Sequence, residues 1–394
     1  DEEDPIAKTY QKIYPKLFKS SSEISDELRS HLRYPNAMFK IQTLNKISDI
    51  IYTQLSADTY TVAKEEPVPD GILVRSAAMH DMELGENLLG IARAGAGVNN
   101  IPIDKCSKQG ICVFNTPGAN ANAVKELVIA GMLLSGRNIL GGAAWAQNLK
   151  GTEGIEKATE KGKGQFAGHE IGGKTLGVIG VGAIGLLVAN AGVALGMNVM
   201  GYDPYISVDN AWKLSRSIVH AKTEDELIAA SDYLSIHVPL MDSTRGKIDA
   251  AFIAKMKDGA VLLNFARGEL VDVDAVLAAL ESGKLSAYVC DFPTEKLLGV
   301  KNVICLPHIG ASTPESEDNC VRMAAKQLDD YIKYGVIRNS VNYPNADPGP
   351  VVEPRICVLT QNVPNVVSSV TGVVSKKNIN IDHMFNKSKG KYAY

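Results

Sequence analysis

Apolar runs of strand length alternate with longer amphipathic stretches from Phe39 onward. Short apolar runs bounded by glycine or polar turns are typical of strands in parallel sheets, and longer stretches with a period near 3.6 are typical of the connecting helices. The predicted strands are 39–44, 71–74, 89–93, 111–115, the run from Leu176, 198–202, 233–238, 261–265, 287–290 and 303–306. The clearest predicted helices are 121–136 and 315–334. This alternation predicts an α/β fold, and 394 residues have room for two or three domains.

The two ends of the chain depart from this pattern. Residues 1–37 are polar and form an atypical leader before Met38, a candidate natural start. The stretch YPKLFKSSSEISDELRSHLRYP within it resembles part of an uncharacterised family of large bacterial membrane proteins, and the alternative is a simple helical arm. The proline-rich segment 344–354 predicts a linker. Residues 355–394 have the pattern of a strand, a helix and the start of a strand, which is half of a βαββαβ module.

Charge and cysteine content narrow the possible partners. The net charge is −3, with no global basic field and no polybasic tail, so neither a nucleic acid nor a membrane surface is an expected partner. Six scattered cysteines without C-x-x-C spacing indicate reduced thiols in a cytoplasmic protein, with no metal site. The stretch 176–200 is uncharged and long enough to span a bilayer, but six glycines interrupt it. Those glycines have a better explanation.

Three of them form a G-x-G-x-x-G motif directly after a predicted strand and at the start of a helix. Gly180 permits the tight turn, Gly182 lets the backbone approach a pyrophosphate, and Gly185 lets helix and strand pack closely. The next predicted strand ends at Asp203, whose carboxylate can accept hydrogen bonds from both ribose hydroxyls and would repel a 2′-phosphate. The motif therefore predicts an NAD-binding Rossmann domain.

Three further residues each follow a predicted strand: Arg267, Glu295 and His308. Side chains beyond the carboxyl ends of parallel strands converge on the crevice that holds the ligand. Arg267 can bind a carboxylate and polarise an adjacent oxygen, His308 can exchange a proton, and Glu295 can orient the imidazole. This set suits oxidation of a 2-hydroxy acid. His237 and His220 are the rival bases, and His237 could instead line the adenosine side.

Four motifs, GVGAIG, IHVPLMDSTRGKID, LLNFARGELVD and LPHIGAST, resemble the signatures of the D-isomer-specific 2-hydroxyacid dehydrogenases over residues 39–343. The resemblance implies a Rossmann domain (137–322) inserted in a discontinuous flavodoxin-like substrate domain (38–136 and 323–345), with Arg267, Glu295 and His308 as the catalytic triad. It also implies a cofactor-binding set consisting of Gly180, Gly182, Ala183, Ile184, Gly185, Asp203, His237, Val238, Pro239, Thr244, Phe265, Ala266, Asp291, Gly310 and Ala311.

Two loops, LVRSAAMHD and ARAGAGVNNIPID, resemble the D-3-phosphoglycerate dehydrogenase branch of this family. This implies that Arg75 binds the substrate phosphate, and that Ser76, Gly97, Val98 and Asn99 also contact substrate. The reaction implied is NAD-dependent oxidation of D-3-phosphoglycerate to 3-phosphohydroxypyruvate, the first step of serine biosynthesis. Another D-2-hydroxy acid (lactate, glycerate or glyoxylate type) and a non-catalytic NAD(H)-sensing regulator are the alternatives.

The tail 355–394 resembles the start of an ACT domain, the serine-sensing module of that branch. Asn362 matches a position that can bind effector serine, whereas Asn365 stands where a glycine is usual. The resemblance also implies a homodimer or a higher homo-oligomer.

Overall fold

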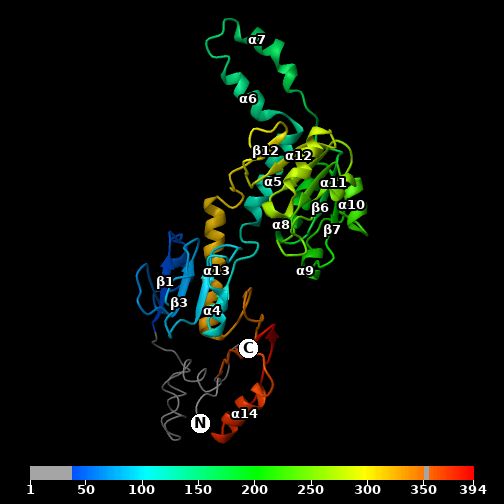
Figure 1. Ribbon diagram of the computed structural model, residues 1–394. Helices are drawn as coiled ribbons and strands as arrows, with labels where there is room; N and C mark the ends of the chain where they lie inside the picture. Colours follow the sequence, from blue (N-terminus) through cyan, green and yellow to red (C-terminus); the bar gives the residue numbers. More distant parts are fainter. Residues whose placement is uncertain (1–37, 350–354) are drawn as a thin grey trace. The chain divides into compact units, whose positions relative to one another are not determined.

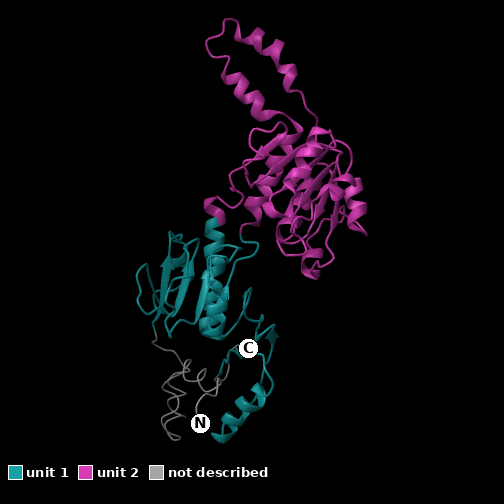
Figure 2. Ribbon diagram, in the orientation of Figure 1, with its two compact units in different colours: residues 1–119, 317–394 teal, residues 120–316 magenta. Residues whose placement is uncertain are grey.

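A computed structural model describes residues 38–349 and 355–394 (Figure 1). The expected leader, 1–37, lies outside the described residues. The chain divides into two compact units, residues 1–119 with 317–394 (unit 1) and residues 120–316 (unit 2) (Figure 2). The predicted α/β class is confirmed, because both large sheets are parallel and helices connect their strands.

Unit 1 is built on a five-stranded parallel sheet of order β2-β1-β3-β4-β5. The strands are β1 (Phe39–Leu44), β2 (Tyr60–Ala63), β3 (Gly71–Val74), β4 (Gly90–Arg93) and β5 (Cys112–Phe114). This is the flavodoxin-like order, in which the chain direction across the sheet reverses between β1 and β3. The short helices α3 (Ile51–Gln54) and α4 (Ile103–Lys108) connect the strands, and sequence reasoning missed β2 and both helices.

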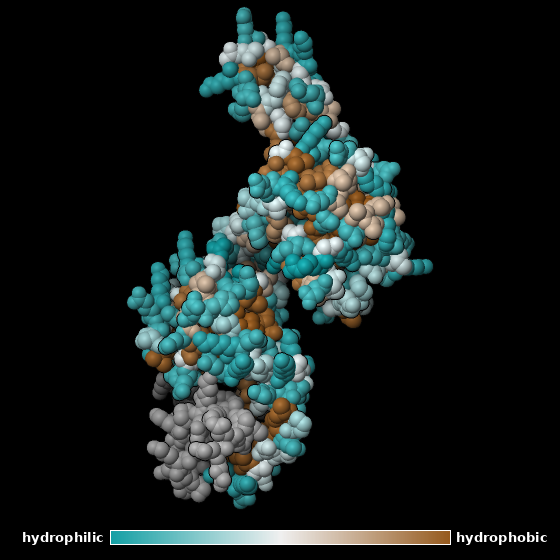
Figure 3. Space-filling model, in the orientation of Figure 1, coloured by the Kyte–Doolittle hydropathy of each residue, from teal (hydrophilic) through white to brown (hydrophobic). Residues whose placement is uncertain are grey.

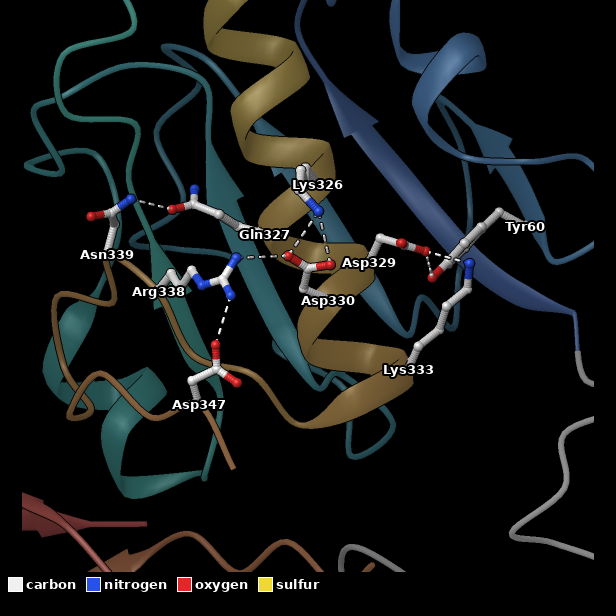
Figure 4. A network of polar contacts seen from close by, with 9 residues as sticks. All are labelled: Tyr60, Lys326, Gln327, Asp329, Asp330, Lys333, Arg338, Asn339 and Asp347. Carbon is white, nitrogen blue, oxygen red and sulfur yellow. Dashed lines mark hydrogen bonds and ion pairs between the residues drawn. The ribbon is translucent and has the colours of Figure 1, made fainter. Parts of the chain in front are cut away.

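Helix α13 (Pro314–Tyr334) covers the sheet of unit 1. Its apolar side places Val321, Ala324 and Leu328 in the core, each at most 3% exposed. Its polar side is fixed by charge pairs and hydrogen bonds (Figure 4). The ion pairs are Lys333–Asp329, Lys326–Asp330, Arg338–Asp330 and Arg338–Asp347, and the hydrogen bonds are Tyr60–Asp329 and Asn339–Gln327. Burial together with Asp329 raises the pKa of the Tyr60 hydroxyl, which stays protonated as a donor.

Unit 2 is built on a seven-stranded parallel sheet of order β12-β11-β10-β9-β6-β7-β8. The strands are β6 (Thr175–Ile179), β7 (Asn198–Tyr202), β8 (Val219–His220), β9 (Tyr233–Ile236), β10 (Ala260–Asn264), β11 (Leu285–Cys290) and β12 (Val303–Cys305). The first six strands in chain order have the doubly wound Rossmann arrangement, which reverses between β6 and β9. The connecting helices are α8 (Ala183–Ala194), α9 (Val208–Ala211), α10 (Glu224–Ala230), α11 (Ala250–Ala254) and α12 (Val273–Glu281).

Helix α5 (Ala121–Gly136) packs against α8 and against strands β10 and β11. Gly131 allows this close approach, because a Cβ there would lie 3.0 Å from the ring of Phe265. The uncharged stretch 176–200 forms β6, α8 and β7, so its apolar character reflects burial within a βαβ unit. Among the described helices no single one is long and apolar enough to cross a membrane, although α5 and the following helix pass that test as a bent pair.

A helical hairpin formed by α6 (Ile139–Gln147) and α7 (Ile155–Gly162) extends from the body of unit 2 (Figure 1). Neither helix has a buried residue, and Ile139, Leu140 and Ile155 are exposed. The surface of the hairpin shows small hydrophobic areas among hydrophilic side chains (Figure 3). Sequence reasoning missed both helices. The Gly/Lys-rich stretch 161–173 starts in the last turn of α7.

The tail forms β13 (Thr360–Gln361), α14 (Val366–Lys376), β14 (Ser388–Lys389) and β15 (Tyr392–Ala393). Its sheet is antiparallel, of order β13-β15-β14, so the expected start of a strand is in fact a complete short hairpin. Hydrogen bonds attach the tail to the rest of unit 1, from Tyr394 to the carbonyl of Gly335, from Lys389 to that of Ser340 and from Arg355 to that of Tyr334.

Candidate active site

The glycine loop lies at the point where the sheet of unit 2 reverses its strand order. Gly180 follows β6 with a φ of 85°, and a Cβ there would lie 2.7 Å from the carbonyl oxygen of His237. At Gly185 a Cβ would lie 2.0 Å from the carbonyl oxygen of Gly180. Both positions therefore exclude a side chain, as the motif predicts.

Gly182 is different, because nothing lies within 4 Å of its Cβ position. It is the N-cap of α8, and no side chain there accepts a hydrogen bond from the helix backbone. The first N–H groups of α8 and the positive end of its dipole therefore face open space. A phosphate group fits this arrangement.

Asp203 follows β7, as the sequence predicts, and is half-buried. Its Oδ2 accepts a hydrogen bond from the backbone N–H of Val181 (2.9 Å), and its Oδ1 accepts one from Tyr205 N (2.9 Å). The carboxylate therefore lies beside the glycine loop and restrains it. Each oxygen has a second lone pair, which leaves capacity for a ribose hydroxyl.

His237 follows β9, on the other side of the strand reversal. Its Nε2 is 2.8 Å from Ser235 Oγ, and its buried Nδ1 has no hydrogen-bond partner among the described residues. Burial lowers the pKa of His237 to about 4, so the ring is neutral at physiological pH. An unpaired buried nitrogen next to the glycine loop is consistent with a ligand group binding there. The rival base His220 is exposed on the edge strand β8.

The loop that carries His308 is fixed by Asp291. This carboxylate is 2% exposed and accepts hydrogen bonds from Ile309 N (2.9 Å) and Gly310 N (2.7 Å). His308 itself is exposed and has a φ of 58°, a conformation that non-glycine residues adopt uncommonly. The rings of Phe292 and His308 pack at an angle of 61°, with their centroids 5.0 Å apart. The loop geometry thus presents the imidazole to solvent on a fixed backbone.

Arg267 and Glu295 are also exposed, at the ends of β10 and β11 respectively. The guanidinium of Arg267 donates to the carbonyl of Ala266 (2.6 Å). Among the described residues, no hydrogen bond or ion pair joins Glu295 to His308. All three predicted catalytic residues therefore follow adjacent strands of one sheet, but the sheet alone does not bring them into contact.

The remaining predicted cofactor residues fall into two groups. The partly or fully accessible residues are Ala183, Ile184, Val238, Pro239, Ala266 and Ala311. Thr244, Phe265 and Gly310 are buried. The Thr244 hydroxyl donates to the carbonyl of Pro239 and so closes that loop, while Phe265 places its ring in the core. Any contact from Phe265 to a cofactor would therefore be made by its backbone.

Arg75 and Ser76 follow β3, at the strand reversal of unit 1. The guanidinium of Arg75 forms an ion pair with Glu317 (2.6 Å), and both side chains are 39% exposed. The side-chain oxygen of Asn45, just after β1, accepts hydrogen bonds from the backbone of Ser76 and Ala77. Asn45 therefore joins the loop after β1 to the loop after β3, and the guanidinium of Arg75 in the second loop already pairs with the carboxylate of Glu317.

The loop after β4 holds the predicted residues Gly97, Val98 and Asn99. All three are at least partly exposed, and the Asn99 carbonyl oxygen is 2.9 Å from His80 Nε2. The neighbouring Asn100 donates to the carbonyl of Ala77 (2.8 Å), which links this loop to the one after β3.

Sequence reasoning missed two residues that position this chemistry. Glu317 pairs with Arg75 across the fold, and no local pattern indicates that contact. Asn264 is fully buried at the end of β10, where its amide donates to the Arg267 carbonyl (2.9 Å) and accepts from Ala266 N (3.2 Å). A polar residue that ends the apolar run VLL was an available signal.

Comparisons with known proteins agree with this geometry. Residues 130–310 match the family model "D-isomer specific 2-hydroxyacid dehydrogenase, NAD binding domain", and residues 1–46 match an uncharacterised protein family (UPF0182). A hydroxypyruvate reductase of Thermotoga maritima is 38% identical over 301 residues, which cover 73% of this chain and 93% of that protein.

A D-3-phosphoglycerate dehydrogenase of Archaeoglobus fulgidus is 37% identical over 298 residues, which cover 72% of this chain and 54% of that protein. The chain thus spans about half the length of this relative and of the Methanocaldococcus jannaschii enzyme of the same name (49%). Among solved structures, NAD+-bound 3-phosphoglycerate dehydrogenase of Entamoeba histolytica is 29% identical, with a TM-score of 0.61 and coverage of 78% of this chain and 99% of that one.

Proposed function

Because the chain belongs to the D-isomer specific 2-hydroxyacid dehydrogenase family, we propose that it oxidises D-3-phosphoglycerate to 3-phosphohydroxypyruvate with NAD, the first step of serine biosynthesis. The observation that supports the substrate is the position of Arg75. Its half-exposed guanidinium lies at the strand reversal of unit 1, where α/β sheets bind ligands, and it already binds an anion. Unit 1 is then the substrate domain and unit 2 the NAD-binding domain, with boundaries near 119 and 317.

The glycine loop and its surroundings suit NAD. The open N-terminus of α8 would bind the pyrophosphate, and Asp203 would bind the ribose. The neutral ring of His237 has a free buried nitrogen for a further contact. When bound, NAD supplies the acceptor for the hydride that leaves C2 of the substrate.

The chain's own residues provide binding and proton transfer. Arg267 binds the substrate carboxylate and polarises the C2 oxygen, because a guanidinium offers two parallel donors and a fixed charge. His308 takes the proton of the C2 hydroxyl and returns it in the reverse direction. Glu295 accepts the other imidazole N–H and stabilises the charged ring once the substrate has brought these groups together.

NADH consumption tests this proposal, with 3-phosphohydroxypyruvate compared with hydroxypyruvate, glyoxylate and pyruvate. We expect the highest kcat/KM for the phosphorylated keto acid, and we expect Arg75→Gln to remove that preference. A higher kcat/KM for an unphosphorylated acid, unaffected by Arg75→Gln, would overturn the substrate and leave the family chemistry intact.

The second candidate activity is reduction of hydroxypyruvate. The relative from Thermotoga maritima favours it, since that protein carries this name and is covered almost completely. A third reading is a non-catalytic NAD(H)-sensing regulator. In that case NADH would bind without turnover of any of the four acids.

The tail supports a partial ACT-like module as a further proposal. Its β-α-β-β order is the first part of a βαββαβ module, and β13 has a neighbour on one side only, so that its other edge can accept another strand. Asn362 lines a hollow of about 620 Å³, and the lining combines polar side chains with apolar ones, namely Asn365, Ser368 and Thr371 with Val363, Val366, Val367 and Met384. The polar groups offer hydrogen-bond partners to a small effector such as serine. Inhibition of NADH consumption by L-serine tests this assignment.

Self-association is the last part of the proposal. Neither helix of the α6–α7 hairpin buries a residue within the chain, and the exposed side chains include the apolar residues Ile139, Leu140 and Ile155. Exposed apolar side chains on an extended element are typical of an interface. Light scattering would give at least twice the chain mass of 42.2 kDa if this surface pairs two copies.

A further inference from the structure

Two cysteines meet beneath the loops that carry the candidate catalytic residues. Cys290 ends β11 and Cys305 ends β12, and the two are register partners in the parallel ladder. Their sulfur atoms are 3.2 Å apart. The remaining thiols differ from this pair: Cys112 contacts the Ser340 hydroxyl, Cys357 contacts the Tyr394 hydroxyl, and Cys106 and Cys320 are buried.

The backbone at this pair suits a disulfide. Register partners on neighbouring strands have Cα atoms about 4.7–4.9 Å apart, inside the range of about 4.4–6.8 Å that disulfides span. The sulfur atoms must approach by about 1 Å to reach a bond of about 2.05 Å. β12 is a three-residue strand at the sheet edge, so it can move without breaking a second ladder.

The two thiols differ in accessibility. Cys305 is partly exposed on the edge strand, whereas Cys290 is buried in the core cluster formed with Tyr288 and Leu297. Burial raises the pKa of the Cys290 thiol to about 12, so this group stays protonated. An oxidant therefore reaches Cys305 first, and Cys290 is positioned to react with the product.

We propose that Cys290 and Cys305 form a peroxide-sensitive dithiol whose oxidation to a disulfide switches the enzyme off. The Cys305 thiolate attacks one oxygen of hydrogen peroxide, the O–O bond breaks, and hydroxide leaves to give a sulfenic acid. The Cys290 sulfur then attacks the Cys305 sulfur, the S–O bond breaks, and water leaves with the Cys290 proton. Two thiols lose two electrons, and one peroxide is reduced to two waters.

The position of the pair explains why oxidation reaches the active site. Cys290 precedes Asp291, whose carboxylate fixes the His308 loop, and Cys305 is three residues before His308. Drawing the strand ends together by about 1 Å displaces this loop. A misplacement of about 1 Å at a catalytic group can reduce turnover about 100-fold, so we expect kcat/KM to fall at least tenfold on oxidation.

The test uses the full-length protein, reduced and then treated with hydrogen peroxide, with Cys305→Ser and Cys357→Ser as variants. Free thiols are blocked under denaturing conditions and the peptides are mapped by mass spectrometry. We expect a Cys290–Cys305 cross-linked peptide in the parent and in Cys357→Ser, the matched control with another half-buried thiol. Dithiothreitol should remove the cross-link and restore NADH consumption, and Cys305→Ser should keep its activity in peroxide.

Absence of the cross-linked peptide under conditions that oxidise other thiols overturns the proposal. So does a cross-link that leaves kcat/KM unchanged, or a Cys305→Ser protein that loses activity as fast as the parent. If Cys305→Ser does not fold, Cys305→Ala replaces it. The activity measurement rests on the proposed dehydrogenase function. The peptide map is independent of that function. If the reduced protein showed no turnover, the result would count against the proposed dehydrogenase activity, and the cross-link could still be tested.

Discussion

Two glycines of the same motif, Gly185 and Gly182, should respond differently to replacement by alanine. We expect Gly185→Ala to lower the stability of the fold, and Gly182→Ala to weaken NADH binding while the fold stays intact. A Cβ at position 185 would lie 2.0 Å from the carbonyl oxygen of Gly180, so backbone must move by more than 1 Å. Overpacking of this kind costs about 1–3 kcal/mol. For a domain of about 150–250 residues each kcal/mol lowers Tm by about 2–4 °C. Gly185→Ala should therefore lower the Tm by roughly 2–12 °C.

Gly182→Ala should leave the fold intact. The residue has φ −76° and ψ −156°, which any residue adopts, and nothing lies within 4 Å of its Cβ position. A glycine-to-alanine change in such a conformation stabilises by about 0.4–1 kcal/mol through the unfolded state. The new methyl group would instead occupy the space that a pyrophosphate needs. Losing one charge-assisted hydrogen bond costs about 1.5–3 kcal/mol, which corresponds to a roughly 10- to 150-fold increase in the Kd for NADH.

Two measurements on the same samples separate these effects. Calorimetry gives Tm without ligand, and the fluorescence of bound NADH gives Kd. If Gly182→Ala binds NADH as tightly as the parent, then the pyrophosphate does not approach the N-terminus of α8 and the fit of the cofactor to this loop is wrong. If Gly185→Ala keeps the parent Tm, then the close helix–strand contact at this glycine is not a constraint.

Four further outcomes follow from the same contacts. Arg267→Ala should reduce kcat/KM about 10²–10⁴-fold, the value of two charge-assisted bonds, while NADH fluorescence gives an unchanged Kd; unchanged turnover would remove Arg267 from the site. Asp203→Ala should relax the preference for NADH over NADPH, measured as the ratio of kcat/KM values, and an unaltered ratio would mean that another residue reads the ribose. Glu317→Gln should free Arg75 and lower the KM for the phosphorylated substrate by roughly 1.5- to 5-fold, because half-exposed ion pairs are worth about 0.2–1 kcal/mol; the KM for hydroxypyruvate is the control, and an equal change in both would contradict a role at the phosphate. Burial lowers the pKa of His237 to about 4 in the fold, against about 6.5 in the unfolded chain, so its contribution to stability is fully present above pH 6.5 and is lost as the pH falls toward 4. Urea unfolding of the parent should show a decrease of about 3 kcal/mol in the free energy of unfolding across this pH window. His237→Gln should not show this decrease, and an equal decrease in the variant would contradict a neutral, buried His237.

Elements with a strong local signal could be predicted from the sequence closely. The predicted bounds of β1, β3, β7 and α5 coincide with the structure, because each is a clean apolar run or a long apolar face between turn residues. The hairpin helices α6 and α7 were missed for the opposite reason. Helix α6 contains the adjacent glycines Gly141 and Gly142, and α7 has only eight residues, so neither gives the long uninterrupted apolar pattern that marks α5.

Contacts that depend on strand register could not be predicted. Cys290 and Cys305 look like two of six scattered cysteines until β11 and β12 are paired residue by residue. Glu317 meets Arg75 only because α13 returns to the first sheet after all of unit 2. Local propensity contains neither fact, since each contact is set by tertiary packing between distant segments.

The positions of the glycine loop, His237 and Arg75 follow from strand order, because in each unit these residues lie where that order reverses. In unit 2 the glycine loop follows β6 and His237 follows β9. These two strands are neighbours, and the strands that come after each of them extend the sheet in opposite directions. In unit 1 Asn45 follows β1 and Arg75 follows β3, with the Asn45 side chain bound to the backbone of the loop that carries Arg75. Loops at such a point diverge to opposite faces of the sheet and leave a crevice between them. The motifs therefore predict the chemistry, and the reversal of strand order explains why the glycine turn is the proposed phosphate site and why Arg75, after a four-residue strand, is the proposed receptor for an anion.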